Sequence, residues 1–560
     1  MSRRRSGPQA QSLLQSQRQS LLQPQSRTHP HPQPSSQPTL GSMLTLMTVR
    51  GIRRATAEWI PAFAGMTAKA AVVGMSAKAA FLGRSTKTAF AGRSTRAFAG
   101  RSAKSPFPGA TGKARATFTG VTAGSGLAAL LASAALAPAL AQNPGSGGGQ
   151  ALLIRNATVH TASERGTLQG ADVLVQGGRI AAIGSGLAAG AAQVVEANGR
   201  PLTPALFGGI TGIGVEEVSG EQSTNDSALA LGQNAKDMVV RPEFDVTLAY
   251  NPDSLLLPVA RVEGIGFTLL AADSRPGGSI IGGQGGTVRL DGSPDPVGPR
   301  LLFVSIGAGA SGLSGSSRAG QWMLLDQLVA EARGRLSADS GFALLTPAGR
   351  SELARYLDGN GRIVVRVDRA ADIRQLLRWS RKQSLKIAIS GGAEAWKLAP
   401  QIAAAGVPVF VDPLVNLPGN FDQLGATLEN AARLRAAGVK VGFSQSGDAS
   451  HNARKVRQLA GNAVANGLPW EDGLAGLTRV PAEVLGVADT LGTIAVGRRA
   501  DLVLWSGDPL DVANTAQQVW LDGRAIPMRS RQTELRDRYL RAEPAAESGA
   551  LPRAYPARIE

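Results

Sequence analysis

Seven polar residues in the second half of the chain could do chemistry, because each follows or ends a short β-rich run. They are three carboxylates, one histidine, two arginines and one asparagine: Arg366, Asp368, Glu394, Asn416, Asp448, His451 and Arg454. In a parallel β/α fold the carboxyl ends of the strands meet at one face, so these side chains are expected to converge there. Carboxylates and imidazole serve as general acids and bases and as ligands of divalent ions.

These residue types divide into two expected roles. The candidate catalytic residues are Asp448, His451, Glu394 and Asp368, and the candidate substrate-binding residues are Arg366, Asn416 and Arg454. No cofactor is predicted outright. The set allows a weakly bound divalent metal ion on Asp448 and His451, with Glu394 as a further donor, because open oxygen and imidazole sites favour hard or borderline ions. Carboxylates near Glu216 or Asp368 are the alternative ligands.

A purely structural interpretation remains open beside this one. Polar residues after strands also serve as helix N-caps and as partners in ion pairs between loops. Asp448 precedes a segment, 452–466, with a helical pattern, and could simply cap it. The sequence therefore leaves two alternatives: a carboxylate/histidine site, or a barrel mouth held by caps and ion pairs.

The residue inventory limits the chemistry further. The chain has only four histidines, at positions 29, 31, 160 and 451, so no histidine-rich binuclear metal centre can be built. It has no cysteine, which excludes disulfides and thiolate metal ligands. Two glycine-rich runs, 282–286 and 307–315, lack the Lys-Ser/Thr ending of a phosphate loop, and we predict flexible loops at the barrel mouth.

The elements that position these residues follow a repeating β/α pattern. Three β-rich runs, Ile363–Val367, Leu385–Ile389 and Val407–Val411, begin 22 residues apart, and Val439–Ser444 follows. Segments with helical spacing fill the gaps, which favours a parallel sheet covered on both faces. We predict an α/β protein with a (β/α)8 TIM-like barrel.

Short strands flank this barrel at both ends. The runs between residues 151 and 196 alternate with glycine turns, and further strands lie between 491 and 524. Between the first group and the barrel lies an apolar, proline-bounded stretch, Pro204-Ala205-Leu206-Phe207, which reads as a buried strand. We expect the two flanking segments to form one composite β-sandwich that clamps the barrel.

Several motifs resemble the amidohydrolase superfamily. The pattern Gly492-x-Ile494-x-x-Gly497-x-x-Ala500-Asp501-Leu502-Val503 is similar to the returning β-domain of that superfamily, and Gly178–Gly184 is similar to its opening half. The chain resembles a divergent, exported branch with an imidazolonepropionase-like composite domain. The resemblance covers about 151–528 and implies hydrolysis of non-peptide carbon–nitrogen bonds with one or two divalent metals.

The resemblance also locates the metal ligands of the superfamily. Its His-x-His positions fall on Ile210 and Gly212, the sixth strand has Gly391 in place of histidine, and the fifth ends in Arg366 and Asp368. These replacements argue against binuclear-metal catalysis. Three hypotheses follow: a divergent hydrolase, a non-catalytic small-ligand-binding protein, and a structural partner of an intact amidohydrolase or of another copy of this chain.

The first 150 residues differ from the rest. Residues 1–120 carry 18 Lys and Arg against one acidic residue, whereas the remainder carries 41 basic and 40 acidic residues, so the net charge of +18 does not indicate nucleic-acid binding. A nine-residue repeat in this leader suggests a translation start placed too far upstream, the alternative being a genuine disordered basic arm. A charge-free run with a small-residue cleavage site at Ala139-Leu140-Ala141 predicts export to the periplasm or secretion.

The expected organisation follows from these points in order along the chain. The segments are a leader at 1–120, a signal peptide at 121–141, a linker at 142–150, the first part of the sandwich at 151–204, the barrel at 205–487, the second part of the sandwich at 488–528 and a tail at 529–560.

Overall fold

The computed structural model describes residues 151–232 and 239–540, all within one compact unit. The predicted leader, signal peptide, linker and most of the tail lie outside the described residues. Within the described ranges, no helix is both long and apolar enough to cross a bilayer.

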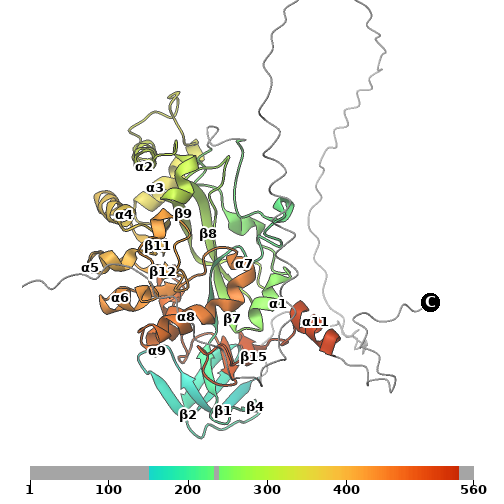
Figure 1. Ribbon diagram of the computed structural model, residues 1–560. Helices are drawn as coiled ribbons and strands as arrows, with labels where there is room; N and C mark the ends of the chain where they lie inside the picture. Colours follow the sequence, from blue (N-terminus) through green and yellow to red (C-terminus); the bar gives the residue numbers. More distant parts are fainter. Residues whose placement is uncertain (1–150, 233–238, 541–560) are drawn as a thin grey trace, which may run out of the picture. The chain divides into compact units, whose positions relative to one another are not determined.

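Eight strands form a nearly closed barrel (Figure 1). In chain order they are β6 Leu206–Thr211, β7 Ile265–Leu270, β8 Ile281–Arg289, β9 Val297–Ser305, β10 Arg362–Val367, β11 Ile387–Gly391, β12 Val409–Val411 and β13 Val441–Phe443. Each pairs with the next along the chain. The edges β13 and β6 are linked by a hydrogen bond from the backbone N–H of Ile210 to Ser444 Oγ (3.0 Å). The predicted β-rich runs Ile363–Val367, Leu385–Ile389 and Val439–Ser444 correspond to β10, β11 and β13, which are the fifth, sixth and eighth strands of the barrel.

One barrel strand runs against the β/α pattern. β8 is antiparallel to both β7 and β9, whereas the other neighbouring pairs are parallel. The connections on either side of β8, residues 271–280 and 290–296, are too short for the crossover of a dozen or more residues that a parallel neighbour needs. The chain therefore turns back directly at both ends of β8.

The glycine run 282–286 lies within β8 and is buried, so its prediction as a flexible loop at the mouth was wrong. Its glycines serve close backbone packing. A Cβ on Gly283 would stand 2.6 Å from the carbonyl oxygen of Phe244, and one on Gly282 would stand 2.5 Å from that of Ala272. The run 307–315 contains a 3₁₀ helix, Ala308–Leu313.

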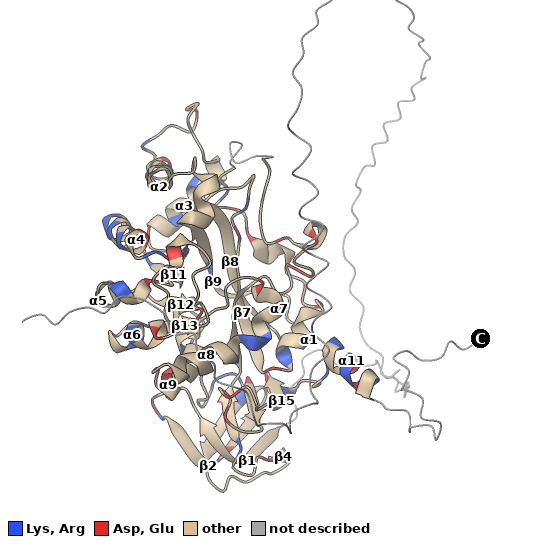
Figure 2. Cartoon of the chain, in the orientation of Figure 1, with Lys and Arg blue, Asp and Glu red and all other residues tan. Residues whose placement is uncertain are grey.

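Helices cover the outside of the barrel (Figure 1). They are α1 Leu256–Arg261, α2 Arg318–Ala332, α3 Pro347–Leu357, α4 Ala370–Gln383, α5 Ala399–Ala404, α6 Asn430–Ala436, α7 Ala449–Asn452, α8 Val456–Ala465, α9 Trp470–Gly476 and α10 Arg479–Leu485, and α11 Arg531–Leu540 follows later in the chain. The helical pattern at 452–466 becomes α7, a 3₁₀ turn and α8. Acidic and basic residues are interspersed over these elements (Figure 2).

The flanking strands form one mixed sheet of eight strands, built from both ends of the described chain. Its strands are β1 Leu152–His160, β2 Thr167–Gln176, β3 Arg179–Gly184, β4 Gln193–Glu196, β5 Pro201–Pro204, β14 Leu502–Trp505, β15 Ala516–Leu521 and β16 Arg524–Ala525. β5 joins the two halves, because it pairs parallel with β1 and antiparallel with β14. The predicted composite domain is therefore present, with its strands hydrogen-bonded into one sheet.

The motif that resembles a superfamily signature packs this sheet. Ile494, Ala500 and Leu502 belong to its apolar core. The N–H of Gly497, which has a positive φ of 83°, donates to the carbonyl of Ile180 on β3. Val503 and Trp505 on the same strand, β14, belong to the barrel core instead, and Trp505 Nε1 donates to Thr203 Oγ1 (2.8 Å). One short strand thus fastens both domains.

Candidate functional site

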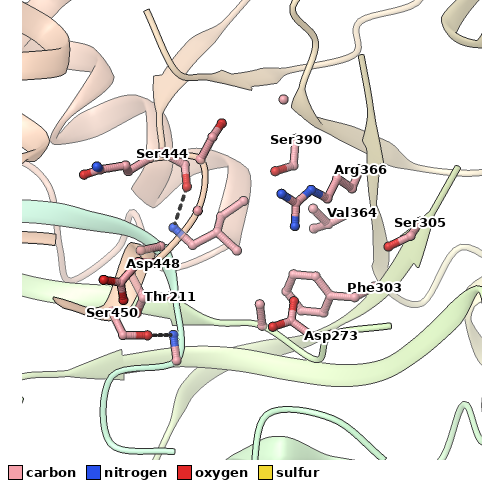
Figure 3. A pocket seen from close by; sticks show the side chains of 18 of the residues that line it. Thr211, Asp273, Phe303, Ser305, Val364, Arg366, Ser390, Ser444, Asp448 and Ser450 are labelled. Atoms are coloured by element: carbon pink, nitrogen blue, oxygen red, sulfur yellow. Dashed lines mark hydrogen bonds between the residues drawn. The ribbon is translucent and has the colours of Figure 1, made fainter. Parts of the chain in front are cut away.

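A polar pocket of about 290 Å³ opens at the carboxyl ends of the barrel strands (Figure 3). Strand ends from most of the barrel supply its walls, which include Thr211 on β6, Asp273 after β7, Ser305 on β9, Arg366 on β10, Ser390 on β11 and Ser444 after β13. This is the face on which barrel enzymes place their chemistry. Of the predicted site residues, Arg366, Asp368 and Asp448 line the pocket.

Three possible metal ligands converge at one side of this pocket. Donor atoms of Glu216, Asp448 and His451 all lie within 4.8 Å of one another. Ser450 connects this group to β6: its hydroxyl donates to Glu216 Oε2 (2.6 Å) and accepts the backbone N–H of Gly212 (3.0 Å). The predicted Asp448–His451 pair is therefore joined by Glu216.

Hydrogen bonds fix the orientation of the His451 ring. Nε2 lies 3.1 Å from the carbonyl oxygen of Glu217, which can only accept, so Nε2 carries a proton. Nδ1 faces Asp448 Oδ1 (3.0 Å) and Ser219 Oγ (3.1 Å). Nδ1 is thus the nitrogen that can take up a proton or ligate a metal ion.

Asp448 is held in place by backbone conformation and not by a capping bond. It occupies the N-cap position of α7 in a left-handed conformation (φ 38°), and its side chain makes no cap hydrogen bond. Its Oδ1 accepts from Ser219 Oγ (2.8 Å) as well as facing His451. Asp448 therefore does not cap the helix through its carboxylate.

Asp273 and Arg366 also line this pocket (Figure 3). Although solvent reaches Asp273, the surrounding protein desolvates its carboxyl and raises the pKa. The positive charge of Arg366 opposes this rise, and the negative charge of Glu216 adds to it. Asp273 therefore holds its proton to a higher pH than an ordinary aspartic acid does.

Asp368 is oriented by two donors. Its Oδ1 accepts the backbone N–H of Ala393 (3.2 Å) and its Oδ2 accepts Gln423 Nε2 (3.0 Å). The neighbouring residue, Asp422, is bound by Arg318, which also pairs with Asp372 (3.0 Å). This buried ion cluster anchors the loop that carries Gln423 against the pocket.

Four predicted site residues lie outside the pocket lining, and one of them, His451, belongs to the group of possible metal ligands beside it. The other three lie apart from that group. Asn416 is exposed in the loop after β12, and Arg454 is exposed in the turn between α7 and α8. Glu394 is buried and serves its own loops: it accepts from Lys397 Nζ (2.7 Å) and from the backbone N–H groups of Gly425 (2.8 Å) and Ala370 (3.0 Å). Burial favours a higher pKa for Glu394, but these donors outweigh it and lower the pKa.

The positions where the sequence resemblance places metal-binding histidines are closed by neighbouring oxygens. A Cβ on Gly212 would stand 3.1 Å from both Glu216 Oε2 and Ser450 Oγ, and one on Gly391 would stand 2.6 Å from Asp368 Oδ1. Carboxylates thus occupy the space beside both glycines. The residues present do not fit a histidine-rich binuclear centre, whereas Glu216, Asp448 and His451 fit a single divalent ion.

Asp273, Ser219 and Ser450 were not among the predicted site residues. Asp273 follows β7, which is an apolar run like the later strands. No helical segment follows β7 within the described residues 271–280, so the β/α pattern did not point to this strand end. Glu216 follows β6 and was expected only as an alternative ligand. The signal for Asp273 was a carboxylate after an uninterrupted buried strand.

Known proteins match parts of this chain. A family model described as the amidohydrolase family matches residues 455–527. Imidazolonepropionase of Aromatoleum aromaticum is 42% identical over 97 residues, which are 17% of this chain and 24% of that protein. Amidohydrolase tasK of Hapsidospora irregularis is 43% identical over 74 residues, which are 13% of this chain and 8% of that protein. Residues 455–527 of this chain are thus similar to the amidohydrolase family.

A solved superfamily structure extends the likeness to the whole fold. The amidohydrolase from Thermotoga maritima superimposes with a TM-score of 0.59 at 24% identity, covering 68% of this chain and all of that one. This likeness establishes the fold, barrel and composite sheet together. The curated relatives named above match over a quarter of their own length or less.

Proposed function

We propose that this protein hydrolyses a non-peptide carbon–nitrogen bond of a small polar molecule in the pocket at the barrel mouth. The observation that carries the proposal is the convergence of Glu216, Asp448 and His451 at the carboxyl ends of the strands. One imidazole nitrogen and two carboxylates are a donor set that divalent ions accept. Such an ion, when bound, would polarise the scissile bond and lower the pKa of a water molecule.

The chain's own residues supply the proton transfers. Asp448 can accept a proton from the attacking water, because His451 Nδ1, when it holds the ion, has no lone pair left for a proton. Asp273, whose pKa is raised by desolvation, can donate a proton to the leaving nitrogen. Water oxygen bonds to the carbon, the carbon–nitrogen bond breaks, and each proton has a named acceptor or donor.

A second function, ligand binding without turnover, is favoured by a different observation. Ile210, Gly212 and Gly391 offer no donor at the positions where the superfamily resemblance expects histidines. A pocket with Glu216, Asp448 and His451 alone would then bind a small molecule and release it unchanged.

Metal analysis with an activity screen separates the two functions. Purified protein is assayed for metal content and then, with added zinc, manganese or cobalt, for hydrolysis of linear amides, cyclic amides and dipeptides. We expect metal-dependent hydrolysis that Asp448→Asn abolishes and that Arg454→Gln, an exposed residue outside the pocket, preserves. Binding of the same compounds without turnover under any metal would favour the second function.

Export and assembly are proposals of a separate kind. We propose signal cleavage after Ala141, on the charge-free run before it. Sequencing of the native protein from its N-terminus should begin at Gln142, and an intact leader on cytosolic protein would contradict cleavage. Association with a second copy or with an intact amidohydrolase is tested by co-purification.

A further inference from the structure

The pocket continues into a second lobe of about 270 Å³, which is more open than the first. The two lobes share four residues: Asn225, Asp273, Ser305 and Arg366. The outer lobe adds Ser227, Ser274 and Arg275. Arg366 therefore stands where the lobes meet and can reach a ligand in both.

The two lobes differ in charge. The inner lobe carries Glu216, Asp368 and Asp448 on its walls, whereas the outer lobe carries Arg275 as well as the shared Arg366. Asp273 is the carboxylate on the outer lobe, where it stands against two arginines. A ligand that lies across both lobes thus meets a cationic end and an acidic end.

Arg366 is available to a ligand. Within residues 151–232 and 239–540, no carboxylate lies within 4.0 Å of its guanidinium nitrogens. Arg275 is held by the carbonyl oxygen of Ala228, while its Nε is buried without a partner in the described part of the chain. Guanidinium groups with unused N–H donors bind carboxylates in a bidentate manner.

Asp368 is a prepared counterpart for a cation. It lies two residues beyond Arg366, so both side chains leave the same face of the strand end, and both line the inner lobe. Its two hydrogen bonds, from Ala393 and Gln423, fix the carboxylate and leave lone pairs on both oxygens. A cationic group can approach it without displacing the protein's own donors.

We propose that this pocket selects a zwitterionic small molecule, with its carboxylate on Arg366 at the outer lobe and its cationic group against Asp368 in the inner lobe. The inference deepens the proposed function, since it names the ligand class of the same site. It leaves Glu216, Asp448 and His451 free for their proposed role.

A matched set of four ligands tests the inference. The probes are L-glutamine, whose side-chain amide is a non-peptide carbon–nitrogen bond, its Nα-acetyl form, its α-amide and the doubly blocked form, and affinities are measured by calorimetry on chelator-treated protein so that turnover does not interfere. We expect the zwitterion to bind about tenfold or more tightly than either singly charged form, because each end gains a charge-assisted hydrogen bond. Equal binding of the four forms, or no measurable binding, would overturn the proposal.

Variants assign each end of the ligand. Arg366→Met should weaken binding of the two forms with a free carboxylate about tenfold or more and leave the α-amide unchanged, whereas Arg366→Lys should retain part of that preference. Asp368→Asn should act in the same way on the two forms with a free ammonium group. Arg374→Gln, at an exposed position on α4, is the control and should change nothing. Unchanged affinities in Arg366→Met, with an unchanged melting temperature, would refute the assignment.

The outcome is separable from the proposed hydrolysis. Tight, charge-selective binding without turnover under any metal overturns the hydrolase proposal and leaves this inference standing. Turnover of the doubly blocked form at the same rate as the zwitterion overturns the inference and leaves the hydrolase proposal standing.

Discussion

The junction between the composite sheet and the barrel gathers charged side chains, as does the barrel mouth, but the two regions treat them in opposite ways. At the junction Arg499 pairs with Asp291 (2.5 Å) and Asp501 (2.8 Å), and these three side chains are at most 11% exposed. At the mouth Arg366 has no described ion-pair partner and stays exposed. Charges are matched and enclosed in one region and left available in the other.

The difference separates residues that hold the fold from residues that meet a ligand. A buried ion pair tolerates no loss of one partner, because the other charge is then stranded. An unpaired charge in an open pocket contributes little to folding, and its free donors or acceptors are what a ligand uses. The comparison therefore predicts opposite responses of stability and binding in the two regions.

The largest expected effect comes from removing the C-terminal half of the junction. A chain that stops after Gly486 lacks β14, β15 and β16, so β5 loses its antiparallel partner and the barrel loses Trp505. We expect insoluble protein without cooperative thermal unfolding by circular dichroism. A chain that stops after Ser530, which removes α11 and no residue described as buried, is the control and should fold. A soluble, cooperatively melting product ending at Gly486 would show that the two domains are independent.

Breaking the ion cluster at the junction, formed by Arg499, Asp291 and Asp501, should have the next largest effect on stability. Arg499→Met strands the carboxylates of Asp291 and Asp501, and we expect a loss of about 3–5 kcal/mol in the free energy of unfolding. Urea denaturation measures the loss. The adjacent Arg498→Met, which breaks no side-chain bond found in the described residues, should cost less than about 0.5 kcal/mol. A similar cost for both variants would contradict the role of the cluster.

Glu394 lies near the barrel mouth, but like the charged residues of the junction it is buried and hydrogen-bonded. Its replacement therefore tests whether a charge that is matched and enclosed stabilises the fold without taking part in binding. Glu394→Gln weakens the bonds from Lys397 and two backbone N–H groups, and we expect a loss of about 1–2 kcal/mol at pH 7. Because the folded pKa is lowered, this contribution is present above the ordinary glutamate pKa of about 4.3 and is lost as the pH falls through the folded value.

Urea denaturation of Glu394→Gln and of the unchanged protein across pH 3–7 tests the predicted direction of this pH dependence. The quantity compared is the difference between their free energies of unfolding. The gap between the two should narrow below about pH 4. Ligand binding should stay unchanged, since Glu394 lies outside the pocket lining. A gap that widens on acidification, or a loss of binding at full stability, would return Glu394 to the candidate catalytic residues.

The smallest expected effect on stability belongs to the residue with the largest expected effect on binding. Arg366→Met should change the free energy of unfolding by less than about 0.5 kcal/mol, because no described ion pair is broken. Thermal unfolding without ligand measures this. A destabilisation above about 2 kcal/mol would mean that Arg366 holds the barrel together, and the contrast between mouth and junction would fail.

The fold was predictable because its signals are local and repeated. Runs such as Ile363–Val367 alternate with helical segments, and the turn at Gly497 marks the returning sheet. The antiparallel strand β8 was not predicted, because the glycines at 282–286 resemble a loop in composition. Their burial depends on tertiary packing against Phe244 and Ala272, which no local pattern encodes.

The candidate site was predictable only in part. Asp448 and His451 were recognisable because they follow a strand end at close spacing, and the structure brings them together. Glu394 and Asn416 carry the same sequence signal, yet the first turns inward to backbone donors and the second lies on an exposed loop. The direction of a side chain after a strand depends on loop geometry, and sequence spacing does not specify it.

The bond between Trp505 and Thr203 joins residues 302 positions apart, and this separation has a consequence for synthesis of the chain. At about 5–20 residues per second, a ribosome needs roughly 15–60 s to make the intervening segment. During that time the edge of β5 and the apolar faces of the first strands have no partner, which is a condition that promotes aggregation. Correct folding of the new chain therefore depends on how quickly β14, β15 and β16 are synthesised, or on a chaperone that shields the unpaired half of the sheet.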